Sequence, residues 1–210
     1  MATYSLTPSA DSYIASGQGN LGSSSGVVAG QITPIQSHLF ARGLFRFDLT
    51  ALAGLAILSA SLRLSLSDAF FPEGPHVISL HETSTTWTEA GVTWTSADGT
   101  NNWTTAGGDY GAAFTTSTVN NGDTSLTFNM LQKVQQRSGG LLNLIAISPE
   151  DGALNHYFTA YSKESGDSSL WPTLTVVAVT PSGAPLQWTV PGAPMHWTEP
   201  AVELPDRKST

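Results

Sequence analysis

Cysteine is absent from the 210-residue chain, and charged residues make up only 11% of it. Without thiols the chain forms no disulfide and offers no thiolate to the common structural zinc sites. Lys and Arg together number eight against sixteen Asp and Glu, which gives a formal net charge of −8. Because a phosphate-binding surface needs clustered cations, and these basic residues are scattered, we expect neither nucleic acid nor an anionic membrane as a partner.

Long apolar runs are also missing. The longest, around residues 52–58, is interrupted by Gly54 and is far too short to span a bilayer. The N-terminal stretch MATYSLTPSADSYIASG has neither a basic start nor an apolar core, so we expect no secretory signal peptide. These features predict synthesis in a cytoplasm without export, either as an intracellular bacterial protein or as a virion component assembled in the host cell.

Apolar residues are plentiful at 40%, and they recur with a period of two. Within Ile57–Leu66 the apolar and polar positions alternate, as in a half-buried strand. Further strands are predicted at residues 11–15, 41–48, 77–81, 141–147, 156–161 and 174–179, with turn sequences between them. Many short strands of this kind predict an all-β, antiparallel jelly-roll β-sandwich.

The stretch 41–48 predicts the orientation of its side chains. Phe45 and Phe47 are expected to face the core, with Arg42, Arg46 and Asp48 on the other face.

One segment, Phe128–Gly139, departs from this period because its apolar residues 130, 131 and 134 have helical spacing. Asn129 is suited to cap the N-terminus, and Gly139 or Gly140 to end the helix. We therefore predict one short helix.

Several stretches match a known family when they are taken together. They are Ala10–Ile14, Arg42–Thr50 with Ile57–Leu64, Trp87–Trp94, Phe128–Gly139 with Leu141–Ile147, and Ser162–Glu164 with Pro172–Leu174. In this order they resemble the DNRLRE family of jelly-roll domains, which overlaps with a carbohydrate-binding module family. The resemblance covers about residues 10 to 180, and it departs at Asn129 and Leu131, where the family has Asp and Thr.

The resemblance implies a non-catalytic jelly-roll module of a type found in extracellular enzymes, adhesins and some phage structural proteins. Certain members bind acidic polysaccharide. The matching motifs mostly determine the architecture, so they are stronger evidence for the fold than for any particular ligand.

The composition changes after residue 180, where six of the twelve prolines fall within the last thirty residues. We place the domain at 1–180 and an extended, Pro/Trp-rich arm at 181–210, in which GAPLQWTVP is followed directly by GAPMHWTEP. Large apolar side chains are costly to leave in water, which favours a docking role over a loose tail. The predicted docking residues are Leu186, Trp188, Met195 and Trp197.

Two motifs resemble enzyme signatures but lack the secondary structure that those signatures require. Gly17–Gly22 spells GxGxxG and Gly22–Gly26 spells GxSxG, but no helix pattern follows either one, and there is no α/β alternation. The five histidines show no metal-ligand spacing, and nothing singles out a pair of carboxylates for glycoside hydrolysis. We predict no catalytic residue, no metal ligand, no cofactor and no enzyme activity.

A structural calcium site is a less favoured alternative to the prediction that the chain binds no metal. Its candidate ligands are the loop carboxylates Asp98, Asp109, Asp123, Glu150 and Asp151. Solvated turn residues are the simpler interpretation.

Aromatic residues supply the candidates for sugar stacking. Trp87 and Trp94 belong to the family pattern and are expected in the core. Trp103 lies in a polar loop and is the best candidate for an exposed aromatic, with Tyr110 beside it as a second stacking residue.

The leading functional hypothesis is a phage virion accessory protein, anchored through residues 181–210 to capsid, collar or fibre proteins and expected to be oligomeric. The alternative is a carbohydrate-binding module that recognises a surface glycan through Trp103 and nearby tyrosines.

Overall fold

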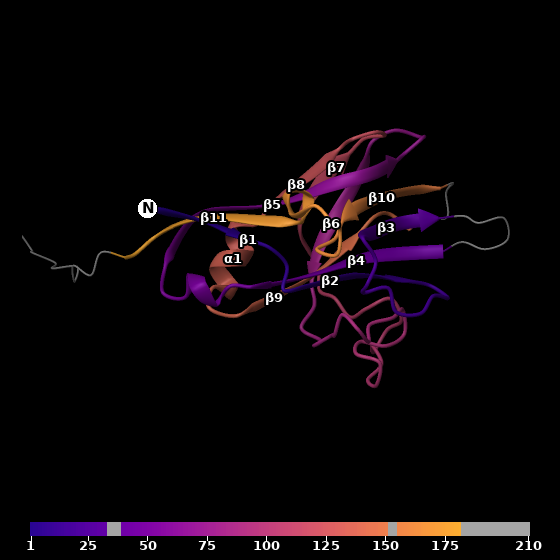
Figure 1. Ribbon diagram of the computed structural model, residues 1–210, viewed down its shortest axis with the longest axis horizontal. Coiled ribbons are helices and arrows are strands. Elements are labelled where there is room, and N and C mark those ends of the chain that lie inside the picture. The colour runs from indigo at the N-terminus through magenta and orange to yellow at the C-terminus, as the bar shows by residue number, and fades with distance from the viewer. Residues whose placement is uncertain (33–38, 151–154, 182–210) are drawn as a thin grey trace, which may run out of the picture.

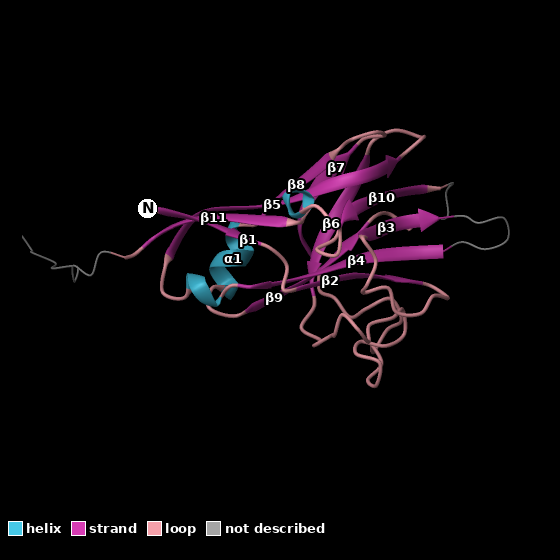
Figure 2. Cartoon of the chain, in the orientation of Figure 1, coloured by secondary structure: helices cyan, strands magenta, loops and turns pink. Residues whose placement is uncertain are grey.

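The computed structural model describes residues 1–32, 39–150 and 155–181, which form two layers of antiparallel strands with one short α-helix (Figures 1 and 2). The strands are β1 (Ala2–Leu6), β2 (Ala10–Ala15), β3 (Gly26–Ile32), β4 (Leu39–Asp48), β5 (Ala56–Phe70), β6 (His76–Glu82), β7 (Ala113–Val119), β8 (Ser125–Asn129), β9 (Leu141–Ile147), β10 (His156–Tyr161) and β11 (Thr173–Val179). The helix α1 spans Leu131–Arg137, and two 3₁₀ turns span Thr50–Leu52 and Ser168–Leu170. The predicted all-β jelly-roll class with one short helix is confirmed.

All the strand pairs are antiparallel, and the sheet curls so that β5 belongs to both layers. The first part of β5 pairs with β11 and β8, and its last part pairs with β10. The register shifts between Thr159 and Ala160 of β10, where β5 passes from one layer to the other. Such an irregularity bends a strand and allows one long strand to turn a corner.

The main core lies between the two layers. Strand alternation sends Leu62, Leu64 and Val176 into it from one layer, and Phe45 and Phe47 from the other. The sequence prediction for Phe45 and Phe47 is therefore confirmed.

The helix α1 is shorter than the predicted segment. Phe128 and Asn129 end strand β8, and the helix begins at Leu131. The Asn129 side chain accepts a hydrogen bond from the Leu131 backbone N–H at 3.1 Å. The N-cap position is Met130, whose side chain makes no capping bond, so Asn129 supports the helix from one residue before the cap that was predicted for it.

Four strands were not predicted, namely β1, β3, β7 and β8. β3 contains two glycines and β7 contains three threonines, so neither shows a clean alternation of apolar and polar residues. Their pairing with β4, β10 and β6 makes them strands.

Within the described residues, we find no helix with the length and apolar content that crossing a membrane requires.

Candidate functional site

The long loop between β6 and β7, residues 83–112, covers the outer face of β2, β4 and β9 (Figure 1). It buries Trp87 and Trp103 against Leu44 of β4 and Ile145 of β9 in a second hydrophobic cluster. β4 is therefore buried on both faces, with Phe45 toward the main core and Leu44 toward the loop.

The prediction that Trp103 is exposed is wrong. Only 5% of the residue is accessible, and its indole Nε1–H donates to the Thr93 backbone oxygen at 2.9 Å. The polar neighbours of Trp103 in the sequence lie at the surface of the loop, whereas its ring belongs to the cluster beneath. Trp103 therefore offers no face to a sugar. Trp87 is fully buried and Trp94 is half-buried, in keeping with their predicted place in the core.

Arg42 on β4 ties the loop to the sheet. Its guanidinium forms two hydrogen bonds of 2.7 Å with the Glu150 carboxylate and one of 2.7 Å with the Gly107 backbone oxygen. It also lies 4.9 Å from the ring centre of Trp94 and 5.1 Å from that of Tyr110. A planar guanidinium can bond in its plane and stack on its faces at once, so one side chain orients both aromatic rings.

Tyr110 is 40% exposed, and its contact with the Arg42 guanidinium holds the ring in place. The His81 ring packs against it in a T-shaped arrangement with 4.9 Å between the ring centres. Tyr110 is thus an ordered aromatic at the surface, and its predicted role in sugar stacking remains a prediction that its position allows.

Three adjoining hollows of about 350, 440 and 430 Å³ run from α1 past Tyr110 to the loop. The first and second share Lys133, and the second and third share Tyr110, so they form one shallow groove. We call it the Tyr110 groove and define it by Gln132, Lys133, Arg137, Glu82, Tyr110 and Thr104.

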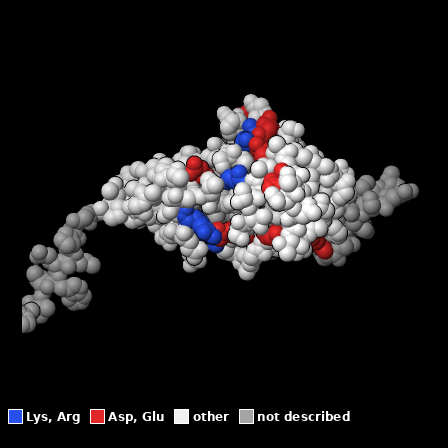
Figure 3. Space-filling model, turned by 90° about the horizontal axis from the view of Figure 1, so that it is seen from below, with Lys and Arg blue, Asp and Glu red and all other residues white. Residues whose placement is uncertain are grey.

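The charges in the middle of the groove come from Glu82, Lys133 and Arg137. Lys133 Nζ lies 2.9 Å from one Glu82 oxygen, and the Arg137 guanidinium bonds to the other. Burial alone would raise the Glu82 pKa, but the hydrogen bonds from the two cations outweigh it and hold the pKa below its usual value. Asp109 also lines this hollow, so two cations lie beside two carboxylates and this part of the groove carries no net charge. The face seen in Figure 3 carries a few basic residues among scattered acidic ones.

A second exposed aromatic surface lies at the ends of β5 and β10. Phe70, which is 40% exposed, stacks on Tyr157 with 6.0 Å between the ring centres. The Tyr157 hydroxyl donates to Asp68 at 3.0 Å. Among the residues that the structure describes, no cation contacts this pair, and the pair lines none of the hollows described above.

The described loop carboxylates that were considered as calcium ligands already bond to other groups of the chain. Asp98 accepts backbone N–H groups from Thr100 and Asn101, and Asp109 accepts those of Thr104 and Thr105. In the same way Asp123 accepts the N–H of Asn120, and Glu150 binds Arg42. Asp151 lies outside the described residues.

Within residues 1–32, 39–150 and 155–181, one group of three potential metal ligands converges, and none of its members was predicted. It consists of Asp11, Glu89 and Glu164, which stand in the motifs ADSYI, WTEAGVTW and SKE quoted above. The motifs were the available signal, but they were interpreted as architecture alone. The histidines of the described residues do not join any such group, and His76 and His156 stack on each other at 4.8 Å.

The predicted docking residues Leu186, Trp188, Met195 and Trp197 all lie outside the described residues. Their role stays a prediction.

The fold defines a jelly-roll module with a shallow, mostly polar groove on its surface. The chain belongs to carbohydrate-binding module family 96, whose family model matches residues 2–176. A comparison with curated proteins gave no match.

Proposed function

We propose that this protein is a non-catalytic module that binds an acidic polysaccharide in the Tyr110 groove. The observation that carries the proposal is the exposed, ordered Tyr110 ring in a groove whose centre holds Lys133 and Arg137. Aromatic rings stack on the apolar faces of sugars, and cations bind their carboxylates. Gln132, Gln136 and Thr104 add donors and acceptors for hydroxyl groups along the groove.

The electrostatics of the groove argue against hydrolysis of the bound glycan. A glycosidase needs one carboxyl that stays protonated near neutral pH, beside one that is ionised. Glu82 and Asp109 both line the second hollow, but hydrogen bonds hold the pKa of each below its usual value. Both are therefore ionised, and neither can act as a general acid.

Replacing Tyr110 by alanine is expected to weaken binding of a polyuronate such as polygalacturonate or alginate about tenfold or more, because the stacking surface is lost. Replacing Lys133 by glutamine should weaken polyuronate binding several-fold and leave binding of a neutral β-glucan unchanged. Isothermal titration calorimetry with size-defined oligosaccharides measures both effects. Tyr157→Ala is the matched control, since it removes the tyrosine of the other exposed aromatic surface. Loss of affinity in Tyr157→Ala, with none in Tyr110→Ala, would move the site to the Phe70–Tyr157 pair.

Replacing Glu82 by glutamine is expected to strengthen polyuronate binding about threefold, because Lys133 and Arg137 lose their internal counter-ion. The same change should lower stability by less than about 1 kcal/mol, since this partly exposed ion pair is worth little. Glu73→Gln, a change at an exposed carboxylate outside the groove, controls for net charge. Equal gains in both variants would mean that the overall charge, and not the groove, governs affinity.

The family match supports glycan binding more than the virion role predicted from the sequence. Attachment to a phage assembly depends on residues 181–210, almost all of them outside the described chain. That role, the virion location and oligomerisation remain predictions.

A further inference from the structure

Strand β10 presents alternate residues on the outer face of its layer. Tyr157, Thr159 and Tyr161 are half-buried, whereas the residues between them are buried. Because each strand residue rises by about 3.3 Å, the two tyrosines lie about 13 Å apart along the same face. Phe70 of β5 pairs with Tyr157, stacks on its ring and is 40% exposed. We call Phe70, Tyr157 and Tyr161 the β10 aromatic row.

Glycines on β3 leave the tyrosines without a neighbouring side chain on that strand. Gly30 is the register partner of Tyr157, and Gly26 is that of Tyr161. A Cβ at Gly30 would stand 2.6 Å from the Tyr157 Cα, and one at Gly26 would stand 2.8 Å from Thr159 Cγ2. Gly30 also has a φ of +137°, which residues with a side chain rarely adopt. A flat ligand can therefore approach both rings across β3.

The Tyr157 ring is oriented by its neighbours on β5. Its hydroxyl donates to Asp68 Oδ2 at 3.0 Å, and Phe70 stacks on the ring. Burial raises the Tyr157 pKa above its usual value, and the bond to Asp68 adds to the rise, so the hydroxyl stays protonated. The ring is held before any ligand binds, which lowers the entropy lost on binding.

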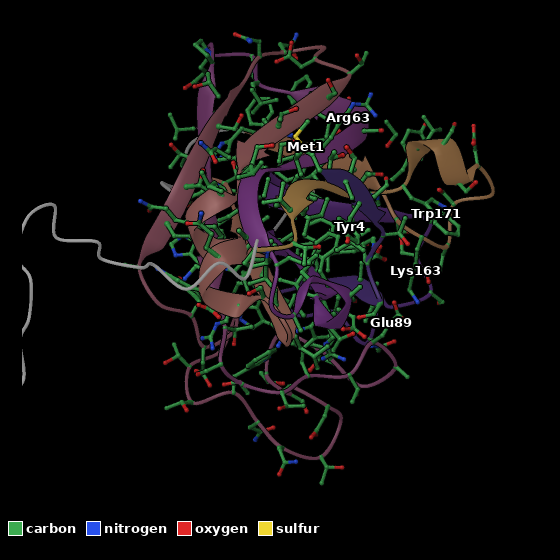
Figure 4. All side chains as sticks on the ribbon, turned by 90° about the vertical axis from the view of Figure 1, so that its left-hand side faces the viewer. Met1, Tyr4, Arg63, Glu89, Lys163 and Trp171 are labelled. Carbon is green, nitrogen blue, oxygen red and sulfur yellow. The ribbon has the colours of Figure 1, made fainter. Side chains whose placement is uncertain are left out.

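The charge beside the row is negative. Asp68 is exposed and pairs with Thr159, in the middle of the row. Each cation–π contact within the described residues involves rings other than these. Lys163, the cation nearest to β10 in the sequence, lies 3.0 Å from Glu89 and 3.4 Å from Glu164, and Figure 4 shows it beside Glu89. A polyuronate would therefore meet a carboxylate at the row, and the row itself supplies no positive charge.

We propose that the β10 aromatic row binds a neutral, β-linked glycan chain, separately from the polyuronate in the Tyr110 groove. Aromatic rings pack on the apolar faces of sugars, and Asp68 can accept hydrogen bonds from their hydroxyl groups. The rings lie along one strand, so an extended chain can contact both tyrosines through different sugars. The row and the groove share no residue, so the two proposals can fail separately. With both sites occupied, the protein would join an acidic polysaccharide to a neutral one.

The test is calorimetric titration of the full chain with cellohexaose, xylohexaose and mannohexaose. We expect at least one of them to bind, and Tyr157→Ala and Tyr161→Ala each to weaken that binding about fivefold or more. Both variants should bind polyuronate as the wild type does, whereas Tyr110→Ala should lose polyuronate affinity and keep the neutral ligand. Tyr157→Phe keeps the ring and should weaken neutral binding less than about threefold. Failure of all three hexasaccharides to bind, or binding that survives both alanine changes, would overturn the proposal.

A competition experiment on the unmodified chain does not depend on the folding of any variant. With the groove saturated by a polyuronate oligosaccharide, the neutral hexasaccharide should bind with unchanged affinity and shift the NMR signals of Phe70, Tyr157 and Tyr161. Displacement of the hexasaccharide by the polyuronate would contradict a separate site. Tighter binding of a chitosan oligosaccharide than of the neutral chains would also contradict the proposal, because Asp68 would then be recognising a cationic sugar. Binding of the hexasaccharide by a chain that binds no polyuronate would support the row and remove the groove proposal alone.

Discussion

Replacing Trp87 by alanine is expected to lower the free energy of unfolding by about 3–5 kcal/mol. Trp87 is fully buried at the centre of the second cluster, between the loop 83–112 and the outer face of β4. The Arg46 guanidinium also lies 4.5 Å from its ring centre, a contact that alanine would remove. Urea denaturation measures the change, and a loss below about 1 kcal/mol would show that Trp87 does not anchor the loop.

Trp87→Phe is the matched variant. The indole Nε1 is buried without a hydrogen-bond partner among the described residues, so replacement by phenylalanine removes an unsatisfied donor as well as some apolar area. The ring that Arg46 contacts is kept. We expect this variant to stay within about 1.5 kcal/mol of the wild type. A loss as large as that of Trp87→Ala would mean that the indole nitrogen has a partner.

Replacing Arg42 by methionine is expected to lower stability by about 3 kcal/mol, the lower end of the range for breaking a buried ion pair. The lower end applies because the Glu150 side chain is 21% exposed. The change also removes the bond to Gly107 and the contacts with Trp94 and Tyr110, so hydrogen exchange should quicken in residues 104–111.

Arg42→Lys should recover less than half of that stability, because an ammonium cannot make the paired hydrogen bonds of the guanidinium. The control is Arg63→Met on β5, where the arginine is exposed and donates a hydrogen bond to Ser65. We expect that control to change stability by less than about 0.5 kcal/mol. Unchanged exchange in Arg42→Met would contradict the view that Arg42 orients the loop.

Trp87 and Arg42 connect the fold to the proposed function. The loop 83–112 has no regular strand or helix, so its shape depends on the cluster around Trp87 and on the Arg42 contacts. Tyr110 and Thr104, which line one end of the groove, belong to this loop. A loosened loop should therefore weaken glycan binding without any change in the groove residues themselves.

The fold class could be predicted from the sequence because strand alternation is a local signal. The strands at Leu141–Ile147 and His156–Tyr161 were predicted with the bounds that the structure gives. β7 was not predicted because its threonines obscure the alternation of apolar and polar residues. Its pairing with β6 makes it a strand. The same local reasoning wrongly predicted that Trp103 is exposed. Its sequence neighbours are polar, but they give no information about the sheet that the loop covers.

The candidate sites depended on contacts between distant residues. Asp11, Glu89 and Glu164 are separated by more than seventy residues at each step, and only the path of β2, the loop and β10 brings them together. The groove likewise joins α1 to the loop 83–112 through Lys133 and Tyr110. Tyr110 was named from the sequence for its residue type, but the sequence did not reveal the cations beside it.

The most direct test of the central claim is an NMR titration of the isotope-labelled chain with a polyuronate oligosaccharide. The account predicts the largest chemical-shift changes at Tyr110, Lys133 and Arg137 and in residues 104–111, with little change at Phe70 and Tyr157. Shifts confined to the Phe70–Tyr157 surface, or none at saturating oligosaccharide, would contradict it.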